Sequence, residues 1–454
     1  MGSARGALGV ELRSQLHLAL PVIGVQVGLY AMGAVDAAFM GRVSEHAFGA
    51  VALGHSLSFA LLGFAMGTLA ALDPIVAQAH GAGEDGAITR AQQRGVVLAL
   101  ALAALVGGIL ACAAPLLRLM RQPEEVLPLA TAYLHVSIAG VPAFLLFVAQ
   151  RQTLQATHRL RPLVLVIVGA NGLNAALDWL WIAGPFGLPS YGAVGCAWAT
   201  VAARWALALG VVWIAGAEHR ARLWPPAPGL WSRAAFARML HVGLPIGLSF
   251  GLEIGAFACV LVMMGQLGAL ELAGHQVVMQ LASASFMLPL GLSMAAAVRV
   301  GNAVGRGDAE GVRRATRLAL GLGAGAMVAA GALFLLAPRP LARLFTDLEP
   351  VLALAVTLIP IAGLFQVFDG LQGVALGCLR GMADTRVPLL IHLLGFWGVA
   401  VPLSAYLGLE RGWGARGLWW GLAAGLLAVA IVQVWRVRVK LRAGVRRFEA
   451  EERG

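Results

Sequence analysis

The chain has 454 residues, of which 59% are hydrophobic and only 12% are charged, and its mean hydropathy is +0.81. These values exclude an ordinary soluble globular protein, in which about a quarter of the residues are charged, and indicate a polytopic membrane protein. The net charge of +11 would suggest nucleic-acid binding in a soluble chain, but the arginines here fall between apolar segments, so we expect no nucleic-acid partner.

Twelve apolar segments are each long enough to cross a bilayer as a helix. The sequence therefore predicts an all-α polytopic membrane protein with twelve transmembrane helices embedded in a lipid bilayer. The predicted helices cover residues 14–40, 49–73, 94–117, 127–150, 162–183, 192–216, 239–265, 270–297, 316–338, 351–379, 387–408 and 414–436.

The basic residues predict the orientation of these helices. If the N-terminus is cytoplasmic, 25 of the 33 Lys and Arg residues lie on the cytoplasmic side and seven on the opposite side, with Arg204 inside a helix. Cytoplasmic loops of membrane proteins carry an excess of Lys and Arg. We therefore predict that both termini are cytoplasmic and that the protein resides in the cell inner membrane.

The two halves of the sequence repeat each other. Residues 18–21 (LALP) are echoed by 242–245 (VGLP), and glycines such as Gly67 and Gly81 recur at the same constant offset, as Gly291 and Gly305. Six helices per repeat make the two copies parallel, which predicts two pseudo-symmetric six-helix bundles. The predicted parts are an N-lobe (1–216, helices 1–6), a cytoplasmic linker (217–238), a C-lobe (239–440, helices 7–12) and a cytoplasmic tail of basic and acidic residues (441–454).

Acidic and polar residues within the N-lobe helices are candidates for a cation site. Asp36 lies in an apolar segment without Lys or Arg, and inserting a carboxylate there costs on the order of 2.5–3.5 kcal/mol. Asn174 and Asp178 share one helix face at similar depth, and Thr200 could add a neutral oxygen. Two such carboxylates could share a proton or bind Na⁺ together with Asn174. The alternatives are a protonated structural Asp36, a helix-capping Asn174 and an interfacial Asp178.

The C-lobe offers Glu253 and Asp369, and neither apolar segment contains a basic residue that would neutralise them. Such acids suit Na⁺, H⁺ or organic cations. Asp73, at the predicted inner end of the second helix, is interpreted as a helix-end charge near water. Six apolar residues could form an adaptable wall for flat cationic substrates, although ordinary helix packing also explains them: Met263, Met264, Phe286, Met287, Phe365 and Phe368.

Several classes of protein are excluded by missing motifs. The one lysine, Lys440, lies near the C-terminus, so the chain has no Walker A loop with which to hydrolyse ATP. No catalytic cluster at a membrane interface is visible either. We therefore expect no enzymatic activity and no cofactor other than a coupling ion, Na⁺ or H⁺.

These motifs together resemble the multidrug and toxic compound extrusion family, in its bacterial NorM-like branch. The resemblance covers nearly the whole chain, and the segments that carry it are 35–41, 74–83, 172–179, 195–200, Glu253, 369–373 and 379–381. It implies a secondary antiporter that exports cationic drugs and other toxic compounds by alternating access. It also implies a coupling site at Asp36, Asn174, Asp178 and Thr200, and a cation or substrate site at Glu253 and Asp369.

One departure from the family pattern is Asp73, which precedes Pro74 where an uncharged residue is usual. The alternative function is a flippase for lipid-linked precursors within the same superfamily. Such a flippase would need arginines in its cavity, whereas Arg204 is the intramembrane arginine that the hydropathy pattern indicates. We expect a monomer. The sequence does not choose between Na⁺ and H⁺.

Overall fold

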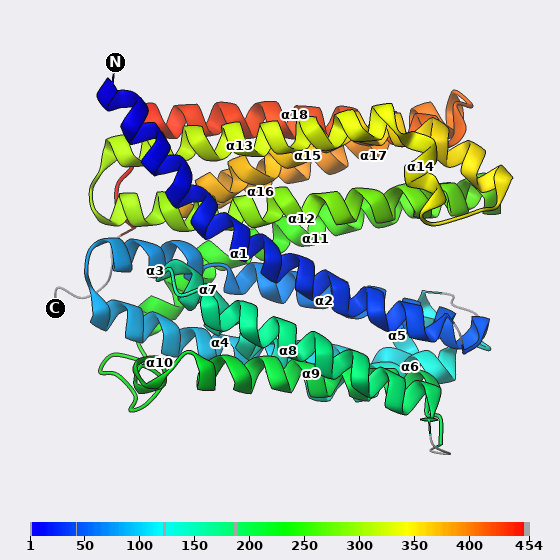
Figure 1. The fold of residues 1–454 in the computed structure, drawn as a ribbon, viewed down its shortest axis with the longest axis horizontal. Helices are drawn as coiled ribbons and strands as arrows, with labels where there is room; N and C mark the ends of the chain where they lie inside the picture. Colours follow the sequence, from blue (N-terminus) through cyan, green and yellow to red (C-terminus); the bar gives the residue numbers. More distant parts are fainter. Residues whose placement is uncertain (1, 42, 121–123, 186–188, 449–454) are drawn as a thin grey trace. The chain divides into compact units, whose positions relative to one another are not determined.

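The structure is a computed structural model that describes residues 2–41, 43–120, 124–185 and 189–448. Every regular element in these ranges is a helix (Figure 1). The α-helices are α1 (Gly2–Met40), α2 (Glu45–Leu69), α3 (Leu72–Gly81), α4 (Asp85–Ala111), α5 (Ala113–Leu119), α6 (Leu127–Ser137), α7 (Val141–Ala156), α8 (Arg161–Asp178), α9 (Gly192–Ile214), α10 (Ala217–Ala221), α11 (Arg233–Leu267), α12 (Ala269–Gly305), α13 (Ala309–Leu336), α14 (Pro338–Arg343), α15 (Glu349–Gly381), α16 (Arg386–His392), α17 (Val401–Ala405) and α18 (Gly414–Ala443). The described residues also include a 3₁₀-helix, η1 (Ile138–Gly140), and the π-helices η2 (Trp179–Ala183), η4 (Leu393–Ala400) and η5 (Tyr406–Glu410).

Twelve helical stretches among the described residues are long and apolar enough to span a membrane, which confirms the predicted number. Several are longer than the hydropathy pattern predicts. The second stretch continues to Gly81, the third begins at Asp85, and the eighth ends at Gly305. The additional turns contain polar residues, which lower their hydropathy, but tertiary contacts keep these turns helical.

Contacts divide the chain into two compact units. Unit 1 comprises residues 1–23, 73–83 and 248–454, and unit 2 comprises residues 24–72 and 84–247. In unit 1, α15 packs against α12, α13 and α18, and in unit 2, α9 packs against α6, α7 and α8 (Figure 1). Each unit therefore includes short segments from the other sequence repeat, and the predicted lobe boundaries remain a prediction.

The boundary between the two units falls at equivalent places in α1 and α11. The division falls after Ile23 in α1 and after Gly247 in α11, which are equivalent positions of the two repeats. In unit 1, Gly291 of α12 lies directly against Ile23, and in unit 2, Gly247 lies against Phe64 and Thr68 of α2. A glycine at each contact lets two helix backbones approach closely, as is common between transmembrane helices.

A second glycine-mediated contact in unit 1 joins α3 to α12. A Cβ atom on Gly81 would collide with the carbonyl of Asn302, and one on Gly305 would collide with the carbonyl of Gln78. Gln78 also donates its Nε2 to the carbonyl of Gly381 at 3.0 Å and accepts the backbone N–H of Phe448 at 2.8 Å. This side chain therefore links α3, the end of α15 and the C-terminal segment.

Within unit 2, three consecutive residues of α4 bind the segment between the repeats. Gln93 donates to the carbonyls of Arg222 and Pro225 and accepts the N–H of Ala227. Arg94 donates to the carbonyls of Gly229 and Leu230. These bonds satisfy backbone groups that would otherwise need water. Residues 222–230 thus follow a defined path along α4.

Gln92, the first of the three residues, reaches α10. Its Nε2 donates to Gln150 at 2.8 Å and lies 3.3 Å from Nε2 of His219. His219 is buried, and burial together with the nearby Arg159 and Arg222 guanidinium groups lowers its pKa from 6.5 to about 4. The imidazole is therefore neutral at physiological pH.

We predict that Gly305→Ala destabilises the protein, because the new methyl group collides with the backbone of α3. The expected loss is on the order of 1–3 kcal/mol, as for other overpacked sites. Thermal unfolding of the purified protein in detergent would measure it. Gly321→Ala is the matched control, because a Cβ there meets no atom within 4 Å. Equal melting temperatures for the two variants would contradict the packing argument.

We also predict that α10 loses stability in acid through His219. Because the folded state lowers the pKa of this histidine, its stabilising contribution is complete above pH 6.5 and falls as the pH approaches 4, by at most about 1.4 kcal/mol per pH unit. The melting temperature should drop less between pH 7 and pH 5 in His219→Gln than in the wild type. The same drop in both would show that His219 does not contribute.

Candidate functional site

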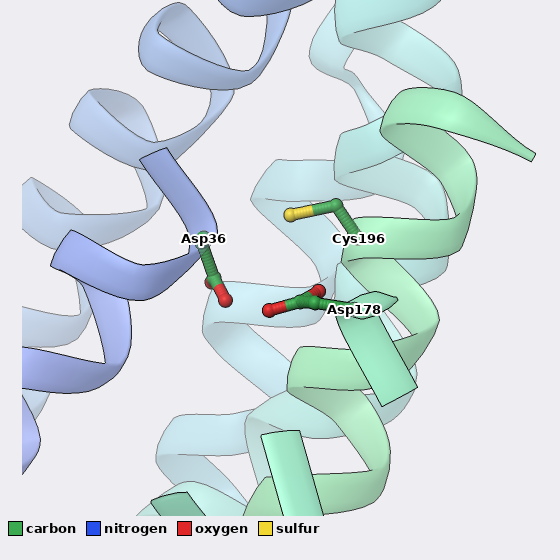
Figure 2. A group of neighbouring side chains, drawn as sticks. All are labelled: Asp36, Asp178 and Cys196. Carbon is green, nitrogen blue, oxygen red and sulfur yellow. The ribbon is translucent and has the colours of Figure 1, made fainter. Parts of the chain in front are cut away.

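The predicted coupling residues of the N-terminal repeat come together inside unit 2. Asp36 lies near the end of α1, Asp178 is the last residue of α8, and Thr200 and Cys196 lie one turn apart in α9. One atom each from Asp36, Asp178 and Cys196 lie within 4.8 Å of one another, and the two carboxylates point toward each other (Figure 2). Oγ1 of Thr200 lies 2.9 Å from Oδ2 of Asp36, to which it donates.

The local backbone explains how α8 and α9 present these groups. α8 changes directly after Asp178 into the π-helix η2, and π-helical turns are frequent at functional sites. The carbonyl of Trp181 in η2 accepts the N–H of Tyr191 at 2.8 Å. Gly195 lies against the same carbonyl, where a Cβ would come within 2.9 Å of the oxygen. This close approach brings Cys196 and Thr200 next to the end of α8.

Several polar atoms at this site lack a hydrogen-bond partner among the described residues. Asp178 and Asn174 are fully buried, and both side-chain oxygens of Asp178 and both amide atoms of Asn174 are unsatisfied. Oδ1 of Asp36 is unsatisfied as well. Buried polar groups are normally paired, so such a group of orphaned oxygens calls for an explanation. Carboxylate, amide and hydroxyl oxygens are the donors that Na⁺ prefers, and a carboxylate pair can equally hold a proton.

The position of Cys196 beside two carboxylates could not be recognised from the sequence, because no spacing relates this residue to Asp36. Two further groups act on Asp36 electrostatically, Arg204 and His55. The guanidinium of Arg204 lies over the ring of Phe144 at 5.2 Å.

Arg204 is not the only arginine within the spanning helices, contrary to the hydropathy pattern. Arg94, Arg151 and Arg380 also lie in helical stretches of spanning length, and they are 8%, 1% and 4% exposed. All three lie outside the most apolar part of their helices, toward the ends predicted to be cytoplasmic, and their cytoplasmic location stays a prediction. Arg151, for example, donates from Nη1 to Gln26 at 2.9 Å within unit 2.

The acids of the second repeat meet in unit 1. Glu253 of α11 and Asp369 of α15 are connected by Gln372, whose Nε2 donates to Oε1 of Glu253 at 3.3 Å and to Oδ1 of Asp369 at 3.2 Å. Glu253 and Gln372 line a cavity. The other lining residues are Ser249, Phe250, Phe286, Leu290, Ser293, Gly373, Leu376, Arg380 and His392. Gln372 was not recognised from the sequence, although its spacing of three from Asp369 places both on one helix face.

The expectation that Asp73 lies near water is wrong, and Glu253 has a basic neighbour from outside the two apolar segments. Arg380 lines the same cavity as Glu253 and interacts with it electrostatically, so the carboxylate does have a basic neighbour. Asp73 is 2% exposed and does not lie near water. The second helical stretch is interrupted near Ala70 and continues as α3, which places Asp73 within the protein. Asp73 also interacts electrostatically with Arg380.

Four of the six residues of the predicted substrate wall lie in or against one hydrophobic cluster. Met264 and Phe365 belong to the buried hydrophobic cluster of unit 1, and Met263 and Phe368 pack against it. Met287 is half-buried, and Phe286 lines the cavity with Glu253. Among the six, Phe286 is the residue found on the cavity lining with Glu253 in the described part of the chain.

Comparison with known proteins decides the family. The family model described as MatE matches residues 21–180 and 245–406, two segments that begin at equivalent prolines of the two repeats. The chain belongs to the MatE family. Its relatives include the probable multidrug resistance protein NorM of Rhizobium meliloti, which is 34% identical over 94% of this chain and 93% of its own length. The multidrug resistance protein PmpM of Pseudomonas aeruginosa is 34% identical over 98% and 94%.

Solved structures show the same fold. A eukaryotic MATE transporter superposes with a TM-score of 0.89 at 20% identity, covering 95% of this chain and 96% of the other. A MOP superfamily transporter from Pyrococcus furiosus gives a TM-score of 0.86 at 19% identity, covering 95% and 96%. Membership of the MatE family confirms the resemblance drawn from the motifs, and it makes this chain a multi-pass membrane transporter and not an enzyme.

For the MatE site in unit 2, we predict that Thr200→Val lowers stability, because a buried oxygen of Asp36 loses its hydroxyl donor. The expected cost is on the order of 1–3 kcal/mol, measured as a lower melting temperature in detergent. Thr200→Ser keeps the hydroxyl and serves as the control. A valine variant as stable as the serine variant would mean that this hydrogen bond contributes nothing.

Proposed function

We propose that this MatE protein is a secondary antiporter that exports cationic drugs and other toxic organic compounds in exchange for Na⁺ or H⁺ by alternating access. The observation that carries the proposal is the pair of buried carboxylates, Asp36 and Asp178, with orphaned oxygens and one hydroxyl donor between helices α1, α8 and α9. The names of the relatives, which are multidrug resistance proteins, support the substrate class.

Coupling would arise from the repulsion between the two carboxylates. Two buried acids whose ligand atoms lie within 4.8 Å cannot both stay ionised without a cation or a shared proton. Binding of Na⁺ or H⁺ relieves the repulsion and so favours the conformation in which Asp36 and Asp178 are close. A ligand can shift a conformational equilibrium only through such a difference in affinity. Asn174, one turn before Asp178, would supply an amide oxygen to a bound Na⁺.

The drug would bind at the acids of unit 1. Glu253 carries negative charge into a cavity in the membrane interior, where it attracts organic cations more strongly than in water. Phe250 and Phe286 on the same lining offer aromatic faces on which a flat cation can stack. Asp369 acts through Gln372, which holds both carboxylates.

The basic residues bear on where the protein lies in the cell and how it is oriented. The excess of basic residues in alternate connecting segments supports cytoplasmic termini and insertion in the cell inner membrane. The transporter would work as a monomer, with the coupling ion in place of any cofactor. The units of the sequence repeat would be the N-lobe (1–216) and the C-lobe (239–440).

We predict that Asp36→Asn abolishes gradient-driven export while drug binding is largely retained, because the neutral amide imitates a permanently protonated carboxyl and removes the exchangeable site. Export of ethidium from proteoliposomes would be measured under an imposed Na⁺ gradient and, separately, under an imposed pH gradient. The gradient that drives export in the wild type identifies the coupling ion. Asp347→Asn is the matched control, since it removes an exposed carboxylate.

Two results would overturn the proposal. If the wild type exports ethidium under neither gradient, the protein is not an antiporter of this kind. If Asp36→Asn exports ethidium uphill at the wild-type rate, Asp36 is a structural aspartate and the coupling site lies elsewhere.

A further inference from the structure

Cys196 brings a sulfur atom to the carboxylate pair of unit 2. It lies one turn before Thr200 in α9, and one atom each from Asp36, Asp178 and Cys196 lie within 4.8 Å of one another (Figure 2). All three side chains are buried. The proposed exchange of Na⁺ or H⁺ uses oxygen atoms alone, so the proposed function gives the sulfur no role.

The oxygens of this cluster are available to a metal ion. Both side-chain oxygens of Asp178, which is fully buried, and Oδ1 of Asp36 lack a hydrogen-bond partner among the described residues. The hydroxyl of Thr200 donates to the other oxygen of Asp36, Oδ2, and so orients that carboxylate. Figure 2 shows the two carboxylates directed toward each other, with the sulfur of Cys196 close by. The unpaired oxygens therefore converge where an ion bound by the sulfur would lie.

Helix packing fixes the position of the sulfur. Cys196 follows Gly195, whose close approach to the carbonyl of Trp181 holds the start of α9 against η2. The helix that ends at Asp178, α8, also packs against α9. The thiol and the carboxylate of Asp178 are thus carried by helices in direct contact, and an ion needs only side-chain adjustments to bind both.

One sulfur beside two carboxylates distinguishes between metal ions. Zn²⁺ binds Cys sulfur at about 2.3 Å and carboxylate oxygen at about 2.0–2.2 Å in tetrahedral geometry, so its ligand atoms lie about 3.4–3.6 Å apart. Starting from separations within 4.8 Å, the atoms here need to approach by at most on the order of 1 Å, which side-chain rotation supplies. Hard cations such as Na⁺ and Mg²⁺ prefer oxygen ligands and gain nothing from the sulfur.

We propose that Asp36, Asp178 and Cys196 form a site for Zn²⁺ or a similar thiophilic divalent cation, which blocks export by occupying the carboxylates that the coupling ion needs. On binding, the thiol of Cys196 gives its proton to water and the thiolate sulfur forms the metal bond. A water molecule would complete the four ligands. The block rests on the proposed function, because it assumes that export depends on Asp36 and Asp178. The path by which a coupling ion would reach these acids also admits the metal.

Co²⁺ binding to the purified full-length protein in detergent tests the ligands directly, once the affinity tag has been removed. A Co²⁺–thiolate bond gives a charge-transfer band in the near ultraviolet. We expect this band in the wild type, and its loss when Zn²⁺ displaces Co²⁺. It should be absent in Cys196→Ala and in Cys196→Ser, the second of which preserves the side-chain volume. Cys378→Ala is the matched control, because it removes another fully buried thiol and should keep the band.

Export of ethidium from proteoliposomes tests the block. Each variant would be measured under the gradient that drives the wild type, with Zn²⁺ on both sides of the membrane, relative to its own export without Zn²⁺. Zn²⁺ should inhibit the wild type and Cys378→Ala alike. Cys196→Ala and Cys196→Ser should need on the order of 100-fold more Zn²⁺ for half-inhibition, because one of three protein ligands is gone. Mg²⁺ at the same concentration should not inhibit, because it takes oxygen ligands and retains its waters.

The outcomes separate this inference from the proposed function. A wild type without the thiolate band, or a band that survives in both Cys196 variants, overturns the metal site. Equal inhibition of the wild type and the Cys196 variants by Zn²⁺ overturns the block. If the wild type exports ethidium under neither gradient, the proposed function fails, and the Co²⁺ spectra still decide whether the metal site exists.

Discussion

The constraint on which this structure depends is the high free energy of a carboxylate buried in a membrane without a fixed cation. Each unit contains a pair of acids, Asp36 with Asp178 and Glu253 with Asp369. Oxygens of the first pair lack hydrogen-bond donors, whereas the second pair shares the amide of Gln372. In the proposed antiporter, a lysine or arginine paired with each carboxylate would fill the position that the exchanged cation has to take. The two repeats meet this conflict differently. Unit 2 uses the Thr200 hydroxyl, and unit 1 uses the Gln372 amide with Arg380 nearby.

Hydropathy and residue type were sufficient to predict the twelve helices and to single out the acidic residues within them as candidates for cation sites. Asp36 stood out because an apolar segment of spanning length contained a single charge and no basic residue. Hydropathy did not predict that Arg380 and Asp73 are buried. An apolar segment ends where polar residues begin, whereas these helices continue and bury the two side chains. Cys196 and Gln372 were not recognised because their roles depend on residues far away in the sequence. Periodicity reports which face a residue occupies, but not what the neighbouring helix places opposite.

The path of the segment between the repeats could not be predicted from composition either. Its prolines and arginines are typical of a linker, and the linker at 217–238 stays a prediction. The structure adds that Gln93 and Arg94 hold residues 222–230 along α4 through backbone carbonyls. A segment held in this way has little freedom of its own.

The exchange of segments between the repeats has a consequence for how the protein is made. Ile23 packs against Gly291, so α1 completes its contacts only after α12, some 270 residues later in the chain, has been synthesised. At about 5–20 residues per second, that partner emerges roughly 10–50 s later. During this time the N-terminal end of α1 has to rest against lipid or the insertion machinery. Premature pairing with a wrong helix is thus a hazard of biogenesis, and the two glycine contacts identify the positions where correct pairing is finally fixed.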